Sequence, residues 1–491
     1  MGVIQKQGLQ SAVITYLGIL TGFVSLLIVQ PLFLTPEEIG LTRVLYSFSF
    51  LVATFIPLGF LNITTRFFPK FRNAENNHHG FAGILLRWTS LGTLIVLVLL
   101  GVLKSFFQDL YINESPLFST WFFLVFPLSA VIAWIAVLNN YLFSLFRPIV
   151  PSFLQEVFVR LAFVVLILAY ARFNWSIEYL AWGFAGTYFL QFVLVMAYTF
   201  WRGKPGFNPD TNLYTPALRR EMIRYGSLVF AAGIASMAIK LLDSVVIGQF
   251  LPLELVGIYG IAAYVPIFIE APVNALDKVA NARIAHSWEK NDLANIQTIY
   301  YQSARVLFVV GGFLFLGVTL NAQSAFTWLP DEYAQGVPVL EILSLAALFN
   351  LMTGSNTAII FTSERFHAGA YALVGVALVN LILLYTLIPV WGLEGAAWAT
   401  CLASLLYNTF KFSFIWLRFG MQPFDLKTLW IALSIAVTYW IVKFIPITGQ
   451  ALADIAIRSF SIAVFYLLFL WASGVLPEVK SLLQRGANSA K

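Results

Sequence analysis

Long runs of apolar residues, separated by short polar connections, are the dominant pattern of this 491-residue chain. A helix needs about 20 mostly apolar residues to cross the hydrocarbon core of a bilayer. Because backbone groups must pair with each other inside lipid, and no alternating strand pattern is visible, each run predicts a membrane-spanning helix. The runs cover residues 9–34, 41–68, 82–103, 117–144, 152–172, 178–201, 223–251, 256–282, 298–325, 337–361, 368–390, 393–417, 427–446 and 455–475. The expected fold is an all-α integral membrane protein of about 14 transmembrane helices.

The distribution of lysine and arginine residues between the two ends of these runs predicts the orientation of the chain. With the N-terminus placed in the cytoplasm, only five of the 29 basic residues fall on the outer side, and three lie within spans. The outer five are Arg43, Lys104, Arg172, Lys443 and Arg458, and the three within spans are Arg160, Lys240 and Lys278. The other basic residues, with Arg305 and Lys411 among them, are assigned to the cytoplasmic side. This bias follows the positive-inside rule and predicts an even number of spans with both termini in the cytoplasm.

The composition excludes several functional classes. Hydrophobic residues make up 60% of the chain and charged residues 11%, against about 25% charged residues in a soluble domain. The longest connection, residues 202–222, is too short to fold as a catalytic domain of about 50 residues. No HExxH, CxxC, Walker A or nucleophile-elbow pattern is present, so the sequence supports no metal, no other cofactor and no enzymatic activity. The net charge of +6 is spread over short loops, which argues against nucleic-acid binding.

The chain resembles itself at an offset of 216 to 217 residues. Residues 33–40 match residues 250–257, with Phe, Leu, Glu and Gly in coincident positions. The following pairs also coincide: Arg66 with Arg283, Asn139 with Asn356, Glu178 with Glu394, and Trp182 with Trp398. Because six spans separate the copies, we expect two pseudo-symmetric six-helix lobes of the same orientation, a parallel repeat found in transporters. The predicted divisions are residues 1–204, residues 205–420, and residues 421–491 with two further spans.

Short motifs stand in a fixed order at the ends of the spans. They are Leu34-Thr35-Pro36-Glu37-Glu38-Ile39-Gly40-Leu41, Arg66-Phe67-Phe68-Pro69-Lys70-Phe71, Val256-Gly257-Ile258-Tyr259, Tyr333-Ala334 and Gly392-Leu393-Glu394-Gly395-Ala396-Ala397. In order and spacing, over the whole chain, they resemble the polysaccharide and O-antigen flippase family of the multidrug/oligosaccharidyl-lipid/polysaccharide exporter superfamily. The resemblance implies two six-helix lobes around a central cavity, with two extra C-terminal helices. It also implies movement of an undecaprenyl-diphosphate-linked oligosaccharide from the cytoplasmic to the outer leaflet, for cell-surface polysaccharides such as the O-antigen of lipopolysaccharide.

The eighth span carries a polar stripe. Glu270, Asn274, Asp277 and Asn281 follow the spacing i, i+4, i+7 and i+11, which places them on one helical face, and Lys278 adjoins that face. An ionisable side chain in mid-bilayer costs at least about 2.5 kcal/mol, so such residues face either a cavity or a buried polar network. Both interpretations stay open. In the first, Glu270 and Asp277 are coupling or gating residues and Asn274 binds substrate.

Prolines in two spans predict kinks. Pro57 lies in the second span, and Pro266 and Pro272 lie in the eighth, where each frees a backbone carbonyl. The second span also carries Arg43 and Arg66 near its two ends. Contact with substrate and snorkelling to lipid headgroups account for these two arginines equally well.

Two pairs of opposite charges lie within single spans. Lys240 and Asp243 are three residues apart in the seventh span, and Glu156 and Arg160 are four residues apart in the fifth. Residues at these spacings share a helical face. Each pair therefore has either a structural, neutralising role or a role in coupling and gating.

The diphosphate of the predicted cargo needs fixed positive charges along its route through the protein. A diphosphate carries about two negative charges that hydrocarbon rejects. We expect Arg66 and Arg283, which occupy equivalent repeat positions, to capture it at the cytoplasmic mouth. Lys240 would bind it at mid-depth, Arg43 would lie further out, and Asp243 would compete with the diphosphate for Lys240 and so promote release.

No ATP site is visible, so the expected drive is an H⁺ or Na⁺ gradient, the membrane potential or consumption of the product. The expected location is the bacterial cytoplasmic (inner) membrane, with membrane lipids and the polysaccharide polymerase machinery as partners. One alternative is a cation-coupled multidrug exporter of the same superfamily, although those proteins typically have twelve spans and often a carboxylate in the first, and residues 9–34 contain no charge. A membrane enzyme acting on lipid-linked sugars would need clustered acidic or histidine residues, and a scaffold would lack the polar stripe.

Overall fold

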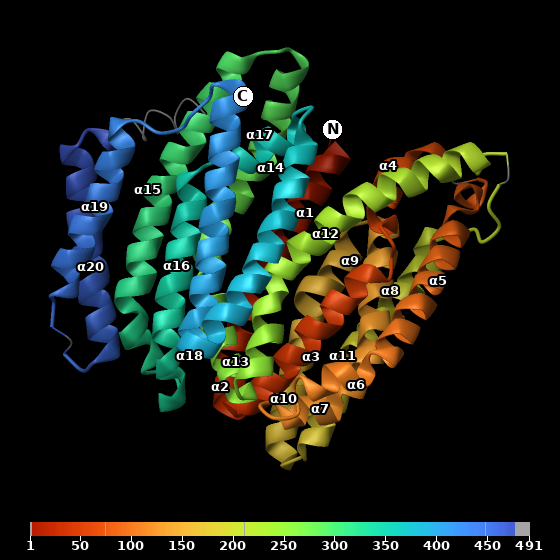
Figure 1. Cartoon of the computed structure of the whole chain (residues 1–491), viewed down its shortest axis with the longest axis horizontal. Helices are drawn as coiled ribbons and strands as arrows, with labels where there is room; N and C mark the ends of the chain where they lie inside the picture. The colour runs from red at the N-terminus through yellow and green to blue at the C-terminus, as the bar shows by residue number, and fades with distance from the viewer. Residues whose placement is uncertain (1, 74, 211, 447, 477–491) are drawn as a thin grey trace. The chain divides into compact units, whose positions relative to one another are not determined.

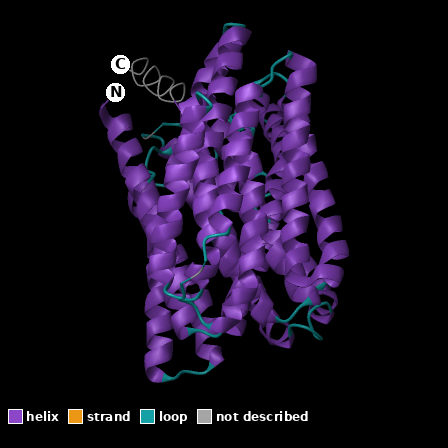
Figure 2. Ribbon diagram, turned by 90° about the vertical axis from the view of Figure 1, so that its left-hand side faces the viewer, coloured by secondary structure: helices purple, strands orange, loops and turns teal. Residues whose placement is uncertain are grey.

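The computed structural model describes residues 2–73, 75–210, 212–446 and 448–476, and the regular elements in these ranges are all helices (Figure 1 and Figure 2). Thirteen helical segments there are long and apolar enough to cross a membrane. They are Val13–Phe33, Pro36–Phe55, Asn77–Val102, Pro116–Ser144, Ile149–Phe173, Ile177–Gly203, Pro216–Phe250, Leu253–Val273, Leu293–Phe326, Asp331–Met352, Phe366–Phe419, Leu426–Lys443 and Ala451–Ala472. Each coincides with one of the predicted runs, except the longest, which covers two.

This longest segment, α18 (Phe366–Phe419), contains two of the predicted spans. As one helix its 54 residues would extend about 80 Å, against about 30 Å of hydrocarbon. Gly392 interrupts it with φ 57° and ψ −132°, a conformation that residues with a Cβ avoid. The break separates the predicted runs 368–390 and 393–417, and it explains the glycine that opens the last of the motifs. The prediction of an all-α membrane protein with about 14 spans is confirmed.

The described residues form two compact units, divided after Gly257. The helices of the first unit are α1 (Gly2–Phe23), η1 (Val24–Val29), α2 (Gln30–Phe33), α3 (Pro36–Phe55), α4 (Phe60–Phe71), η2 (Asn77–Gly80), α5 (Phe81–Val102), α6 (Lys104–Asp109), α7 (Pro116–Trp121), η3 (Phe122–Leu124), α8 (Val125–Ser144), α9 (Ile149–Phe153), η4 (Leu154–Phe158), α10 (Val159–Phe173), α11 (Ile177–Tyr198), η5 (Thr199–Gly203) and α12 (Pro216–Phe250). Helix α13 (Leu253–Tyr264) crosses the division. The second unit continues with α14 (Ile267–Glu289), α15 (Leu293–Phe326), η6 (Asp331–Gln335), α16 (Gly336–Met352), α17 (Asn356–Thr362), α18, α19 (Leu426–Lys443) and α20 (Ala451–Ala472). The divisions predicted at residues 204/205 and 420/421 follow the sequence repeat and stay predictions.

In the first unit, α3 packs against α8 and α12. Helix α3 begins at a capping box, in which the Thr35 hydroxyl accepts a hydrogen bond from the Glu38 N–H at 3.3 Å and the Glu38 carboxylate accepts one from the Thr35 N–H at 2.8 Å. One turn later, a Cβ on Gly40 would lie 1.8 Å from the Leu253 carbonyl oxygen, and a Cβ on Gly257 would lie 2.1 Å from the backbone of α3. The two glycines that coincide in the repeat therefore bring the first turns of α3 and α13 into backbone contact.

Three of the predicted spans are interrupted. The second span turns between α3 and α4 around Pro57, with Gly59 at φ 83°. The eighth span breaks before Pro266, the residue that precedes α14, whereas α14 continues through Pro272. The tenth span breaks between α16 and α17, where Gly354 has φ 61°. Because a break frees backbone polar groups inside the membrane, it is tolerated only where protein or a cavity covers them.

One arginine and one aspartate side chain in the second unit hold the C-terminal hairpin of α19 and α20 against α15. Asp425 caps α19, and its carboxylate accepts hydrogen bonds from Arg305 at 2.6 Å and from the Tyr301 hydroxyl at 2.8 Å. Burial alone would raise the pKa of Asp425, but the hydrogen bonds from Tyr301, Thr428 and Arg305 hold it below its ordinary value. Arg305 lies within α15 and is only 2% exposed, and the cytoplasmic side assigned to it stays a prediction.

Candidate functional site

A buried lysine is the centre of the candidate site in the second unit. Lys411 lies inside α18 and is 3% exposed, and the cytoplasmic side assigned to it stays a prediction. Its ammonium donates a hydrogen bond to the Thr357 hydroxyl at 3.0 Å and lies 4.4 Å from the centre of the Tyr407 ring. The carboxylates whose charges act on it are Asp277 and Glu270, both on α14. A buried ammonium is tolerated only when such partners offset the cost of removing it from water.

Polar side chains of a third element complete this arrangement. The Asn350 amide, on α16, donates a hydrogen bond to the Glu270 carboxylate at 3.3 Å. Thr357 lies on α17, and in this unit α14 packs against α16 and α17, which in turn both pack against α18 (Figure 1). We call Lys411, Asp277, Glu270, Thr357 and Asn350 the Lys411 network. It joins charges that are separated by more than a hundred residues of sequence.

The break between α16 and α17 positions the network. Gly354 has φ 61°, and a Cβ there would lie 2.6 Å from the Ala304 backbone nitrogen, so only glycine fits. The freed Ser355 N–H donates to the Ser303 hydroxyl at 3.1 Å, and the Thr353 hydroxyl donates to the Asn408 side chain at 3.0 Å. The first contact satisfies a freed backbone group, and the two together fix the start of α17, whose first turn carries Thr357, the hydrogen-bond partner of Lys411.

The polar stripe predicted on the eighth span is partly visible. Glu270 and Asp277 are partly buried and belong to the Lys411 network, whereas Asn281 is exposed. Asn274 and Lys278 lie in α14, but their side chains are outside the described residues. The stripe thus supplies the acidic residues of the Lys411 network. The sequence analysis had not connected Lys411, the basic residue of this network, with the stripe.

The first unit contains a second group of charges, around the start of α10. Arg160 and Glu156 form the ion pair predicted from their spacing, at 3.5 Å, with each side chain one-third exposed. Arg160 also donates a hydrogen bond to the Gly18 carbonyl oxygen of α1. Arg43, Glu156 and Arg160 all lie within electrostatic range of the Tyr46 hydroxyl. We call Arg160, Glu156, Arg43 and Tyr46 the Arg160 cluster.

Close packing and an aromatic pair support this cluster. A Cβ on Gly18 would lie 2.7 Å from Glu156 Cβ, so α1 passes directly over η4. The Tyr46 ring stacks on Tyr188 of α11 with ring centres 5.9 Å apart. Arg43 donates a hydrogen bond to the Ser244 hydroxyl of α12 at 3.2 Å and is only partly exposed. It therefore contacts another helix of the protein and does not only extend toward the membrane surface.

The other predicted substrate-binding cations are exposed. Arg66 lies over the Tyr225 ring of α12 at 4.3 Å from its centre. Lys240 is exposed on α12, whereas Asp243, three residues later, is 8% exposed. Arg283 is exposed on α14 in the second unit. A ligand in the surroundings can therefore reach Arg66, Lys240 and Arg283, and the roles of these residues stay predictions.

Sequence reasoning missed Lys411 and its amide and hydroxyl partners. A usable signal was present, because Asn408 and Lys411 are three residues apart within an apolar run, as are Asn350 and Thr353 in another. Each is a polar pair on one face of a membrane helix. The sequence analysis used Lys411 only to orient the chain, as one of the basic residues on the cytoplasmic side.

Comparison with protein families identifies the chain. The family model described as "Polysaccharide biosynthesis protein" matches residues 6–274, which is more than half of the sequence. The chain belongs to this family. The resemblance found in the motifs is therefore confirmed. A search of curated proteins finds no significant match.

Solved structures show the fold of this family member. The lipid II flippase MurJ in an inward closed conformation matches 94% of this chain and 97% of its own, with a TM-score of 0.71 and 13% identity. An inward-facing multidrug resistance MATE family transporter of the MOP superfamily matches 86% of this chain and 94% of its own, with a TM-score of 0.59 and 12% identity. A MOP superfamily transporter from Pyrococcus furiosus matches 88% and 96%, with a TM-score of 0.55 and 12% identity. At such identities the matches show a shared fold of about 14 helices.

Proposed function

We propose that the protein is a flippase that moves a polyprenyl-diphosphate-linked oligosaccharide from the cytoplasmic to the outer leaflet by alternating access. The observation that carries the proposal is the combination of membership in the polysaccharide biosynthesis family with a fold shared, over 94% of the chain, with a lipid II flippase. The undecaprenyl carrier, the bacterial cytoplasmic membrane, cytoplasmic termini and a link to O-antigen or lipopolysaccharide synthesis belong to the same proposal. Polysaccharide polymerases are its expected downstream partners.

The exposed cations support a route for an anionic headgroup. A diphosphate is rejected by hydrocarbon unless fixed positive charges accompany it. Arg66, Lys240 and Arg283 are exposed, so their ammonium and guanidinium groups are not already sealed inside the protein. Arg66 and Arg283 capture the headgroup in this proposal and Lys240 receives it next. Arg43, bonded to Ser244, and Asn274 are later contacts.

The Lys411 network supports coupling to an ion gradient. It brings two carboxylates of α14 within electrostatic range of one buried ammonium of α18. Uptake of an H⁺ by Asp277, with Glu270 as its neighbour in the network, removes an attraction to Lys411 and loosens α14 from α18. An Na⁺ bound by the carboxylates would compete with the ammonium in the same way. Glu156 and Arg160 are a second candidate switch, because their pair holds α1 through Gly18.

Translocation in vesicles tests the proposal. Purified protein is reconstituted with a fluorescent polyprenyl-diphosphate-linked oligosaccharide, and the fraction of sugar that reaches the outer face is measured with a membrane-impermeant oxidant. Wild-type protein should translocate the lipid, Lys240→Ala should lose at least about 90% of the rate, and Lys240→Arg should keep part of it, because a guanidinium still pairs with phosphate. Arg172→Ala, an exposed basic residue in the last turn of α10, is the matched control and should keep the full rate.

Two results would contradict the proposal at different points. A full rate with Lys240→Ala at normal protein level would remove Lys240 from the route and leave the flippase function intact. No translocation by wild-type protein would contradict the function itself.

A cation-coupled multidrug exporter is the second candidate function, because the chain also shares its fold with MATE transporters. The same vesicles discriminate the two functions. An exporter would accumulate a cationic dye against its gradient when a pH or Na⁺ gradient is imposed, whereas the proposed flippase would not.

A further inference from the structure

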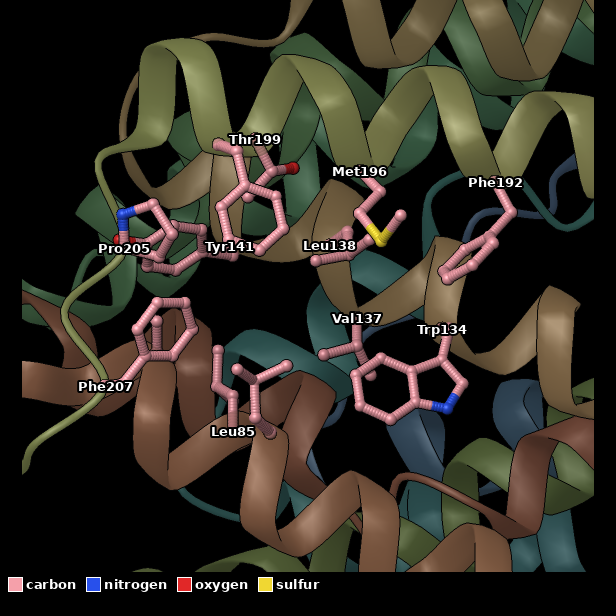
Figure 3. A pocket seen from close by; sticks show the side chains of 13 residues that line it. Leu85, Trp134, Val137, Leu138, Tyr141, Phe192, Met196, Thr199, Pro205 and Phe207 are labelled. Carbon is pink, nitrogen blue, oxygen red and sulfur yellow. The ribbon is translucent and has the colours of Figure 1, made fainter.

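An apolar pocket lies in the first unit, away from the charged groups described above. It is formed by α5, α8, α11, η5 and the loop that follows, and it encloses about 260 Å³ (Figure 3). Its lining side chains include Leu85, Trp134, Val137, Phe192 and Met196, which point toward a common space in Figure 3. No polar side-chain surface of the described residues faces into it except near Thr199. A pocket of this composition accepts hydrocarbon and excludes the sugars or phosphates of a polar ligand.

The far wall of the pocket is a fixed loop. The Tyr141 hydroxyl donates a hydrogen bond to the Gly203 carbonyl at 3.3 Å, and the Gly83 N–H donates one to the Gly206 carbonyl at 3.0 Å. A Cβ on Gly83 would lie 1.9 Å from the Phe207 carbonyl oxygen, so the loop rests directly on the first turn of α5. The pocket is therefore built into the native packing and does not depend on a chance arrangement of surface side chains.

Two basic residues lie in the segment that forms one wall of this pocket. Arg202 and Lys204 are both exposed: Lys204 directly precedes the lining residue Pro205, whereas Arg202 follows the lining residue Phe200 by two positions and lies 4.1 Å from the centre of the Trp201 ring. Residues 199–209 contain no acidic side chain. The lining on α8 extends from Trp134 to Tyr141, which is about 10 Å of helix, and this is less than the roughly 15 Å of hydrocarbon in one leaflet.

We propose that this pocket binds one acyl chain of an anionic phospholipid, whose phosphate pairs with Arg202 and Lys204. The apolar interior selects the chain, and the basic end selects the negative headgroup, as basic pockets beside membrane helices do. We assign the site to a phospholipid of the membrane, and the polyprenyl tail of the cargo is the alternative that the competition experiment distinguishes.

Photo-crosslinking tests this assignment. Full-length protein in phosphatidylcholine nanodiscs is given phosphatidylglycerol with a diazirine in the middle of one acyl chain, and adducts are mapped by mass spectrometry after illumination. We expect the adducts to concentrate on the lining residues of α8 and α11. Met196→Trp, which fills the pocket, should lower this labelling at least about fivefold. Leu190→Trp, on the same helix but outside the lining and 47% exposed, is the matched control and should leave it unchanged.

The headgroup part is tested with surface substitutions that do not alter the packing. Arg202→Gln combined with Lys204→Gln should lower labelling by phosphatidylglycerol about tenfold, toward the level given by phosphatidylcholine with the same diazirine chain. Equal labelling by the two lipids in wild-type protein would overturn the proposal, and so would uniform adducts over all exposed helices. Stronger competition by a polyprenyl phosphate than by phosphatidylglycerol would overturn it in favour of a site for the cargo's tail.

Discussion

The ion pair of the Arg160 cluster in the first unit joins charges that are neighbours along the chain, whereas the Lys411 network of the second unit joins charges on different helices. Glu156 and Arg160 are four residues apart and one-third exposed, so their attraction is partly screened. Lys411 is 3% exposed, and its acidic partners come from α14, more than a hundred residues earlier. The Glu156–Arg160 attraction therefore acts along one stretch of helix, and the cluster reaches α1 through the hydrogen bond from Arg160 to Gly18. In the Lys411 network the attraction itself acts between α14 and α18.

Removal of Lys411 should have the largest effect. Lys411→Met removes the hydrogen bond to Thr357 and the positive charge that acts on Asp277 and Glu270, and the loss of a hydrogen bond from a charged group costs about 1.5–3 kcal/mol. We expect a loss of this order in unfolding free energy, measured by denaturation in mixed micelles. Lys104→Met, at an exposed position, is the control and should change little.

The double variant Lys411→Met with Asp277→Asn sharpens the result, because it removes both charges. Stability should partly return, since a neutral amide is far less costly to bury than an unpaired carboxylate. A double variant as unstable as the sum of the two single variants would show that Lys411 and Asp277 do not interact.

A substitution at the break beside the network should have the next largest effect. Gly354→Ala forces a Cβ into a left-handed backbone conformation and toward the Ala304 nitrogen, which should cost about 1–3 kcal/mol. Gly375→Ala is the matched control, because a Cβ at Gly375 meets nothing within 4 Å and the residue lies inside α18. Equal thermal stability of the two variants would contradict the role given to the α16–α17 break.

The smallest effect is expected at the Arg160 cluster. Arg160→Ala removes a partly screened ion pair and the hydrogen bond to Gly18, which together are worth about 1–2 kcal/mol. Glu156→Gln should cost less, because it leaves the bond to Gly18 in place. Thermal unfolding compares both with Arg172→Ala on the same helix. A loss with Arg160→Ala as large as that with Lys411→Met would erase the distinction between the two regions.

The spans could be predicted from sequence because lipid imposes a simple length and polarity rule on every one of them. The Glu156–Arg160 pair could be predicted as well, since it depends only on the helical repeat. The break at Pro266 followed from the missing N–H of proline. The break at Gly354 did not, because it depends on the approach of Ala304 from another helix, which no local pattern reveals.

The burial of Lys411 and Arg305 was missed for a related reason. Counting of basic residues assigns each lysine or arginine to a side of the membrane and does not ask whether the side chain is buried. Arg305 is instead buried by Asp425 at the start of α19, and Lys411 by α14 and α17. Contacts between elements so distant in sequence are set by packing. The sequence therefore showed Glu270 and Asp277 as a polar stripe, but it did not show that Lys411 lies near them.

Coupling of translocation to proton uptake in the Lys411 network is tested most directly by the translocation rate in vesicles under an imposed pH gradient, compared between wild-type protein and Asp277→Asn. We expect the gradient to accelerate movement of the polyprenyl-diphosphate-linked oligosaccharide by wild-type protein. Asp277→Asn has no carboxylate at this position to take up the proton, so we expect its translocation rate not to respond to the gradient. An equal response of Asp277→Asn and wild-type protein to the gradient would contradict the coupling role of the Lys411 network.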